Sequence, residues 1–168
     1  MIASFGKKVL IVNPFGIGDV LFSTPMISAL KAADPSVQVF YLGNARTSSF
    51  LKNDPRIEKV FSYDRDEFVS VYRRSPWQFF LKWKRFVGMI RAEKFDLAFD
   101  LSLNAGIGLA LKIAGIPRRV GYDYKGRGRF LTERRFLKGY VGRPVAEYYL
   151  NLLEEANVKR CMDQERLC

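Results

Sequence analysis

A single acidic residue, Asp19, stands where a buried strand is expected to give way to a helix. An apolar run at residues 8–13 ends in Asn13, and the turn Gly16-Ile17-Gly18 then leads to Asp19. Open α/β folds bind their ligands at the carboxyl ends of parallel strands, so this turn borders a candidate crevice. A carboxylate there could act as a general base. The alternative is structural, because an acid in the first turn of a helix stabilises the helix dipole and the free amides.

The composition limits which groups can work beside Asp19. The chain of 168 residues has no histidine, and its two cysteines, Cys161 and Cys168, lie near the end. Serine–histidine and cysteine–histidine pairs, imidazole acid–base chemistry and histidine-ligated metals are therefore excluded. A general base must be a carboxylate, a lysine or a tyrosine, and no metal site is expected. The terminal cysteines predict no structural disulfide, which favours a reducing cytoplasm.

Positive charge is concentrated in one segment of the chain. The formal net charge is +11, from 28 Lys and Arg against 17 Asp and Glu. Between residues 112 and 143 only Asp123 and Glu133 oppose a set of basic residues, namely Lys112, Arg118, Arg119, Lys125, Arg127, Arg129, Arg134, Arg135, Lys138 and Arg143. This local excess predicts an anionic partner.

Within that segment, Lys125, Arg127 and Arg129 alternate with glycine. Such a stretch can bind phosphate or carboxylate through its side chains and flexible backbone. A solvated charged loop is the alternative. Nucleic acid is not expected, because no recognised reader motif or stacking platform accompanies the charge.

Strands and helices are expected to alternate along the chain. The patterns predict strands at 8–13, 37–42, 59–63, 95–101 and 119–122, and helices at 20–33, 45–52, 77–92, 106–114 and 144–156. Pro25 falls inside the first helix and predicts either a second start or a kink. The segment 123–142 is expected to be a long functional loop. The alternation predicts an α/β fold with a Rossmann-like, open, mostly parallel sheet and helices on both faces.

Parallel strands bring the residues that follow them to one edge of the sheet. Asn13 and Asn104, at the ends of two predicted strands, are expected to line the same crevice as Asp19. A dinucleotide site is disfavoured there. The third glycine of the G-x-G-x-x-G fingerprint would fall at Leu21, and Gly43-Asn44 stands where an acid should bind a ribose. Gly16 and Gly18 are instead expected to allow a tight strand-to-helix turn.

The predicted helix at 77–92 mixes aromatic and basic side chains. Its large apolar residues form one broad stripe, which favours a core-facing helix: Phe79, Phe80, Trp83, Phe86, Val87 and Ile90. Trp77 and Leu81 lie off that stripe. The alternative for these two residues is contact with a membrane interface beside the neighbouring lysines.

Four stretches of the chain occur in an order and spacing that is known from one family. They read VLIVNPFGIGDVLFSTPMISALKAADPSVQVFYLG, NDPRIEKVFSYD, FDLAFDLSLNAGIGLALKIAGIPRRVGYD and RPVAEYYLNLLEEANV. Together they resemble the N-terminal half of glycosyltransferase family 9, the lipopolysaccharide heptosyltransferases, over nearly all of residues 8–158.

The resemblance implies a two-domain GT-B enzyme that transfers a sugar with inversion and without a metal. Residues 1–158 would be the acceptor-binding Rossmann-like N-domain, and residues 159–168 a tail or the start of the interdomain linker. The donor domain would be absent, so the chain would be half an enzyme, inactive alone. Asp19 matches the family's aspartate in the Gly-Asp-Val turn and inherits the role of the base. Arg143 departs from the family, since many relatives carry histidine there.

The resemblance also implies the partners. The acceptor would be an anionic, lipid-linked core oligosaccharide at the inner face of the cytoplasmic membrane. Its phosphates or acid sugars would contact Arg46 and the basic stretch of Lys125, Arg127 and Arg129. The remaining acceptor-binding residues would be Asn13, Gly16, Gly18 and Asn104. A nucleotide-sugar would be the co-substrate, with no other cofactor. The competing hypothesis is a non-catalytic module of Rossmann-like fold that binds anions or nucleic acid.

Overall fold

The structure is a computed structural model that describes residues 6–158. Six strands form one sheet in the order β3-β2-β1-β4-β5-β6, and every neighbouring pair is parallel. Their bounds are β1 (Lys8–Asn13), β2 (Gln38–Gly43), β3 (Ile57–Ser62), β4 (Leu97–Asp100), β5 (Arg118–Asp123) and β6 (Glu133–Phe136). The predicted Rossmann-like open parallel sheet is therefore confirmed.

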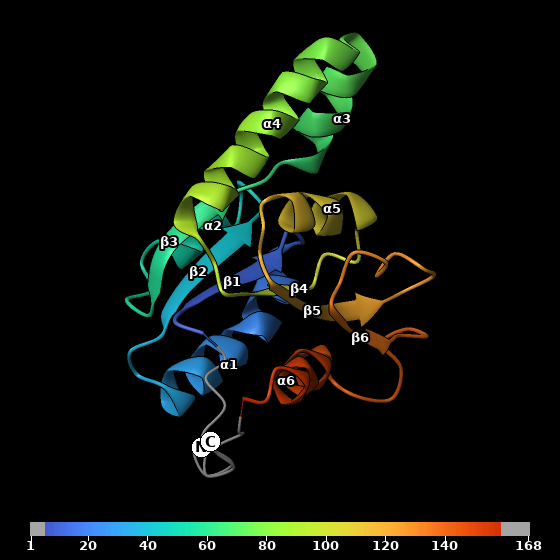
Figure 1. Cartoon of the computed structure of the whole chain (residues 1–168). Helices are drawn as coiled ribbons and strands as arrows, with labels where there is room; N and C mark the ends of the chain where they lie inside the picture. The colour runs from blue at the N-terminus through green and yellow to red at the C-terminus, as the bar shows by residue number, and fades with distance from the viewer. Residues whose placement is uncertain (1–5, 159–168) are drawn as a thin grey trace.

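Helices cover both faces of this sheet (Figure 1). Their bounds are α1 (Ile17–Ala33), α2 (Ser48–Leu51), α3 (Arg65–Arg74), α4 (Pro76–Glu93), α5 (Ala105–Ile113) and α6 (Val145–Glu155). Alternate residues of β1 enter opposite cores, as the two-residue period of a strand requires. Val9 and Ile11 pack with α1 and α6, whereas Leu10 and Val12 pack with α4 and α5. The central strand is thus buried on both faces.

Helix α1 is continuous through Pro25, so neither the second start nor the predicted start at residue 20 is correct. Proline has no N–H to donate to the carbonyl four residues earlier, here that of Leu21. The hydroxyl of Thr24 donates to this carbonyl instead, at 2.8 Å. The neighbouring side chain therefore replaces the missing backbone bond.

Two elements were not expected from the sequence. Helix α3 was missed altogether. Strand β6 lies inside the segment 123–142, so the prediction of one long loop there is wrong. Residues 133–136 are mostly exposed and carry three charged side chains, and hydrogen bonds to β5 define this edge strand. Ion pairs support it, with Arg118 binding Glu133 at 2.8 Å and Arg134 contacting Asp123 at 3.5 Å.

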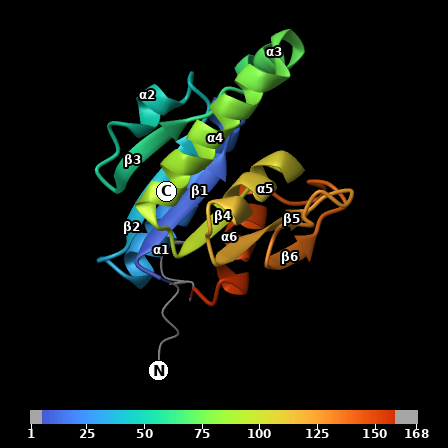
Figure 2. The ribbon, with the colours of Figure 1, turned by 45° about the horizontal axis from the view of Figure 1, so that its top comes forward.

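Helices α3 and α4 form a helical hairpin that extends away from the sheet (Figures 1 and 2). Phe86, Val87 and Ile90 of α4 are buried, as the predicted stripe requires. Trp77 and Leu81 are exposed, also as predicted. Phe80 differs, because it is half exposed near the end of the hairpin, beyond the sheet that would cover it.

Candidate functional site

The carboxyl ends of β1 and β4 form the place where a ligand is expected in this fold. The two strands are neighbours, but the chain leaves β1 toward one face through α1 and leaves β4 toward the other through α5. This divergence makes the edge a topological switch point. Asp19 lies in the first turn of α1, and Asn104 is the N-cap of α5. The two residues therefore flank one edge from opposite faces.

The carboxyl group of Asp19 is partly buried. Desolvation raises its pKa above the ordinary value, and an interaction with its own backbone amide opposes this shift. An acid in the first turn of a helix is otherwise stabilised in its charged form. The raised pKa makes Asp19 a better proton acceptor than an exposed aspartate once it is ionised.

Asn13 holds the turn that carries Asp19 and does not face a crevice. Its side chain is fully buried. The amide nitrogen donates to the backbone carbonyl of Asp19 at 2.9 Å, and the amide oxygen accepts from the N–H of Phe15 at 3.4 Å. Asn13 is thus a positioning residue, although the sequence placed it among the ligand contacts.

Three buried or half-buried tyrosines lie on the same face of the sheet as Asp19. Burial is the main reason that the pKa values of Tyr41, Tyr140 and Tyr149 are raised, and the negative charge of Asp19 raises them further. The hydroxyls therefore remain protonated donors. The rings of Tyr140 and Tyr149 meet edge to face at 6.2 Å. Sequence reasoning missed this cluster, because its members come from β2, the segment after β6, and α6.

The hydroxyl groups of this cluster differ in how they are satisfied. The Tyr41 and Ser23 hydroxyls are 2.7 Å apart and share a hydrogen bond. Among the described residues, the buried hydroxyls of Tyr140 and Tyr149 lack a partner of good geometry, although the two groups interact with each other. A buried donor without a full hydrogen bond carries a free-energy cost, which a ligand or water can remove.

Gly16 and Gly18 differ from the expectation of a tight turn that requires glycine. Gly16 has φ −71° and ψ 177°, which any residue adopts. A Cβ atom at either position would meet no atom within 4 Å. The turn therefore does not need glycine for its conformation. What the two glycines do is leave the backbone at the start of α1 uncovered.

Asp100, at the carboxyl end of β4, is a buried carboxyl group that the sequence analysis did not single out. Its Oδ1 accepts from the backbone N–H of Ser102 at 3.0 Å and from the Ser102 hydroxyl at 2.5 Å. Burial raises the pKa of Asp100 to about 6 despite these bonds. The signal was present, since an acid that ends an apolar strand lies at the ligand-binding edge.

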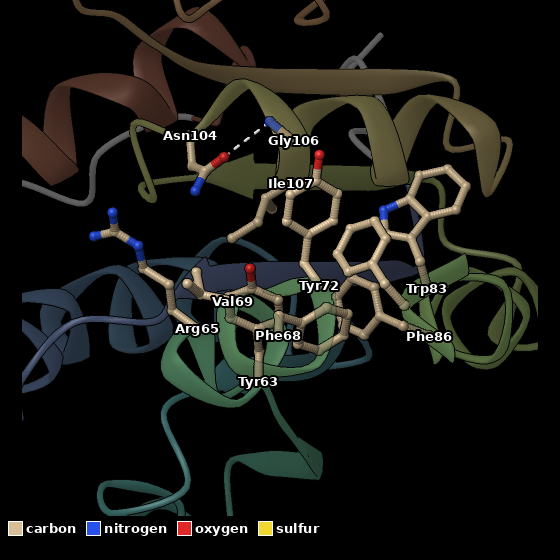
Figure 3. A pocket seen from close by; sticks show the side chains of 11 residues that line it. Tyr63, Arg65, Phe68, Val69, Tyr72, Trp83, Phe86, Asn104, Gly106 and Ile107 are labelled. Atoms are coloured by element: carbon tan, nitrogen blue, oxygen red, sulfur yellow. Dashed lines mark hydrogen bonds between the residues drawn. The ribbon is translucent and has the colours of Figure 1, made fainter. Parts of the chain in front are cut away.

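Asn104 borders a cavity of about 200 Å³ between α5 and the α3–α4 hairpin. Its Oδ1 accepts from the N–H of Gly106 at 2.8 Å, which caps the helix. Figure 3 shows Asn104 and Arg65 on the polar side of the cavity and aromatic rings, among them Tyr72 and Trp83, along the rest. The predicted contact residue thus reaches a real cavity while it also stabilises α5.

The basic stretch follows β5 at the same edge of the sheet and is exposed. Lys125 and Arg127 stack on the ring of Tyr124, and Arg129 on that of Phe130, at 5.1–5.8 Å. The salt bridges found within residues 6–158 include none of these three cations, whereas Arg118, Arg134 and Arg135 are paired with acids. Arg46, in the turn after β2, is exposed as well. The structure gives no direct contact between these cations and Asp19.

Residues 6–158 contain no cluster of three or more Asp, Glu, His or Cys side chains suited to a metal ion. In the same part of the chain, none of the helices has the length and apolar character needed to cross a membrane. Cys161 and Cys168, like all of the predicted tail 159–168, lie outside the described residues.

No model of a known protein family matches the chain. The chain is 23% identical over 149 residues to lipopolysaccharide heptosyltransferase 3 of Escherichia coli. The aligned region covers 88% of this chain and 42% of that protein. It therefore spans less than half the length of this curated relative.

Solved structures of the same kind share its fold. E. coli heptosyltransferase WaaC, solved with ADP-2-deoxy-2-fluoro heptose, superposes with a TM-score of 0.78 at 15% identity, over 94% of this chain and 50% of WaaC. E. coli ADP-heptose lipopolysaccharide heptosyltransferase II gives 0.68 at 21% identity, over 86% and 39%. A family 9 glycosyltransferase from Veillonella parvula gives 0.72 at 20% identity, over 93% and 44%. The resemblance to glycosyltransferase family 9 is confirmed at the level of fold, for part of such an enzyme.

Proposed function

We propose that this chain is the acceptor-binding part of an inverting glycosyltransferase of the heptosyltransferase kind. The carboxylate of Asp19 accepts the proton of an acceptor hydroxyl, and the oxygen attacks the anomeric carbon of a nucleotide-sugar. The bond from that carbon to the diphosphate breaks, and the nucleoside diphosphate leaves with the electron pair. The reaction needs one base and a charge-stabilising site for the leaving group.

The position of Asp19 carries this proposal. Its partly buried carboxyl lies in the first turn of α1 at the switch point between β1 and β4, and Asn13 anchors its backbone. With no histidine in the chain, a carboxylate is the natural base. The fold that the chain shares with heptosyltransferases supports the same reaction.

An anionic acceptor fits the charges at this edge. The basic stretch of Lys125, Arg127 and Arg129 is exposed, and its cations form no salt bridge among the described residues. Arg46 is also exposed and follows β2, on the opposite side of the β1–β4 pair from β5. Arginine forks bind phosphate and carboxylate in a bidentate manner. The open backbone at Gly16 and Gly18 and the side chain of Asn104 give uncharged contacts for sugar hydroxyls. A lipid-linked, phosphorylated oligosaccharide has this chemistry.

The nucleotide-sugar is a co-substrate, held mainly by groups outside residues 1–158, and no other cofactor takes part. One of the similar structures was solved with an ADP-heptose analogue, which makes ADP-heptose the first donor to try. Residues 1–158 would form the acceptor domain, acting at the cytoplasmic face of the membrane where a lipid-linked acceptor is held.

Calorimetric titration of the 168-residue chain with a phosphorylated core oligosaccharide tests the acceptor. We expect binding that weakens with salt and falls about 100-fold or more when Arg127 and Arg129 are both changed to glutamine, since charge-assisted hydrogen bonds contribute about 1.5–3 kcal/mol each. The matched control changes Arg118 and Arg135, which are paired with acids. A dephosphorylated oligosaccharide that binds equally well would contradict an anionic acceptor.

A non-catalytic module that binds anions or nucleic acid is the competing function, and the exposed basic stretch is the observation that favours it. Such a module predicts salt-dependent binding of oligonucleotides that is lost when Arg127 and Arg129 are neutralised. Tight binding of RNA together with no binding of the oligosaccharide would replace the enzymatic proposal by this one.

A further inference from the structure

The α3–α4 hairpin, residues 65–93, is the part of the molecule that the proposed chemistry uses least. Its two helices pack along each other and carry the connection at residue 75 away from the sheet (Figures 1 and 2). The hairpin is anchored on the sheet at its base, through Phe68 of α3 and the buried residues in the second half of α4. The end of the hairpin is therefore free to meet another surface.

Between residues 68 and 92, the charged side chains of the hairpin are all basic. Residues 68–92 contain no Asp or Glu and six basic residues: Arg73, Arg74, Lys82, Lys84, Arg85 and Arg91. Lys82 is paired with Glu67, and Arg91 donates to the carbonyl of Ile113. The salt bridges of the described residues include none of the other four. The end of the hairpin consequently presents unneutralised cations to solvent.

Large apolar side chains are exposed among these cations. Trp77 is 67% exposed, Tyr72 58%, Phe80 51% and Leu81 39%. Trp77 and Phe80 stack on each other at 5.9 Å, so they form one apolar surface and not two separate side chains. An exposed apolar surface of this kind marks an interaction site.

We propose that this end of the hairpin, defined by Tyr72, Arg73, Arg74, Trp77, Phe80 and Leu81, docks on the surface of an anionic lipid bilayer. Tryptophan and tyrosine favour the headgroup level, because each has an apolar body and a polar tip. Lysine and arginine beside them are attracted to anionic lipids. The pairing of insertable apolar side chains with unpaired cations fits a bilayer, whereas a nucleic acid offers no apolar phase for Leu81.

Docking in this way gives the protein a defined orientation. The cavity that Asn104 borders lies between the hairpin and α5, so a docked hairpin holds that edge of the sheet near the membrane. The inference thus extends the membrane location in the proposed function. Its test uses neither acceptor nor donor, so failure to bind vesicles leaves the sugar-transfer proposal standing, and failure of transfer leaves this one standing.

Sedimentation of the 168-residue chain with lipid vesicles tests the proposal. We expect binding to phosphatidylcholine vesicles that contain phosphatidylglycerol, and little binding to phosphatidylcholine alone. Changing Arg73 and Arg74 to glutamine should weaken the partition constant about 25-fold, since each cation near such a surface contributes about 1 kcal/mol. Changing Phe80 and Leu81 to serine should weaken it at least tenfold.

The matched control lies at the end of α2, where Phe50 and the C-cap residue Lys52 are an exposed aromatic residue and an exposed cation away from the hairpin. The F50S/K52Q variant should bind vesicles like the unchanged chain. Insertion can be followed separately in a W83F background, where emission from Trp77 should shift to shorter wavelength on binding. Equal loss in the α2 control, an unshifted Trp77 emission, or tight binding of RNA with no binding of anionic vesicles would overturn the proposal.

Discussion

At the residue scale, the site depends on groups that hold Asp19 rather than on Asp19 alone. Asn13 fixes the backbone carbonyl of Asp19 through a buried amide, and the nearby tyrosine hydroxyls remain protonated. The sequence identified the aspartate and the asparagine because both follow an apolar strand. It could not identify Tyr140 and Tyr149, which reach this region only through the tertiary fold.

Some glycines of the chain are required because a Cβ atom would clash with a neighbouring group, whereas others have space for a side chain. A Cβ at Gly121 would lie 2.5 Å from the backbone oxygen of Asp100, whereas one at Gly18 meets nothing. Gly121→Ala should therefore lower the free energy of unfolding by about 1–3 kcal/mol or more. Gly18→Ala should leave it unchanged or raise it by up to about 1 kcal/mol. Denaturant titration of both variants measures this difference, and an equal loss in the two would contradict the open turn.

Asp100 predicts a pH dependence of stability. Its pKa is raised from 3.8 to about 6 in the folded protein. Between these values the folded state binds more protons than the unfolded state, so this group makes stability fall as pH rises through the folded pKa, and the effect is nearly complete at about pH 7. Asp100→Asn removes the titrating carboxyl group and with it this decrease of stability with rising pH. The stability of the variant relative to the unchanged chain should thus increase by about 2 kcal/mol from pH 4 to pH 7. A difference that does not change with pH would show that Asp100 is not desolvated.

At the element scale, local signals explain what was predicted and what was not. Helix α3 had a signal that went unused: Asp64 is followed three residues later by Glu67, a capping pattern. The Asp64 side chain indeed accepts from the N–H groups of Asp66 and Glu67. Strand β6 had no signal, because an exposed edge strand of charged residues lacks the apolar alternation that predicts strands.

Asn104 joins an element to the candidate site, and substitutions can separate its two roles. Asn104→Ala removes the cap of α5 and should destabilise the protein by about 1 kcal/mol. Asn104→Ser restores an acceptor for the N–H of Gly106 and should recover most of that loss. Thermal unfolding of the two variants measures the cap.

Acceptor titration of the same two variants measures the contact. If Asn104 also contacts the acceptor, both variants should bind the oligosaccharide more weakly than the unchanged chain. If the serine variant binds the oligosaccharide as tightly as the unchanged chain does, Asn104 caps α5 and does not contact the acceptor.

At the scale of the whole molecule, alternation of strands and helices was sufficient to predict the parallel sheet and its carboxyl edge. Asp19, Asn104 and the basic stretch lie at that edge, but the cavity that Asn104 borders is lined by neither Asp19 nor the basic stretch, so a common crevice stays a prediction. Side-chain roles were less predictable, because burial decides them. Asn13 turned inward, and Gly16 and Gly18 proved conformationally unconstrained. The chain matches 39–50% of each similar solved enzyme described above.

Sugar transfer by the Asp19→Asn variant tests the central claim most directly. The chain would be joined to the part of WaaC that it does not cover, and transfer from ADP-heptose to the core oligosaccharide would be followed with Glu58→Gln, an exposed carboxyl on β3, as the matched control. Asp19→Asn should lower kcat about 10²–10⁴-fold, the usual contribution of a general base, while folding and acceptor binding persist. In the unchanged chain, transfer should rise with pH through the raised pKa of Asp19. Transfer by Asp19→Asn within a few-fold of the unchanged protein would contradict the assignment of Asp19 as the base.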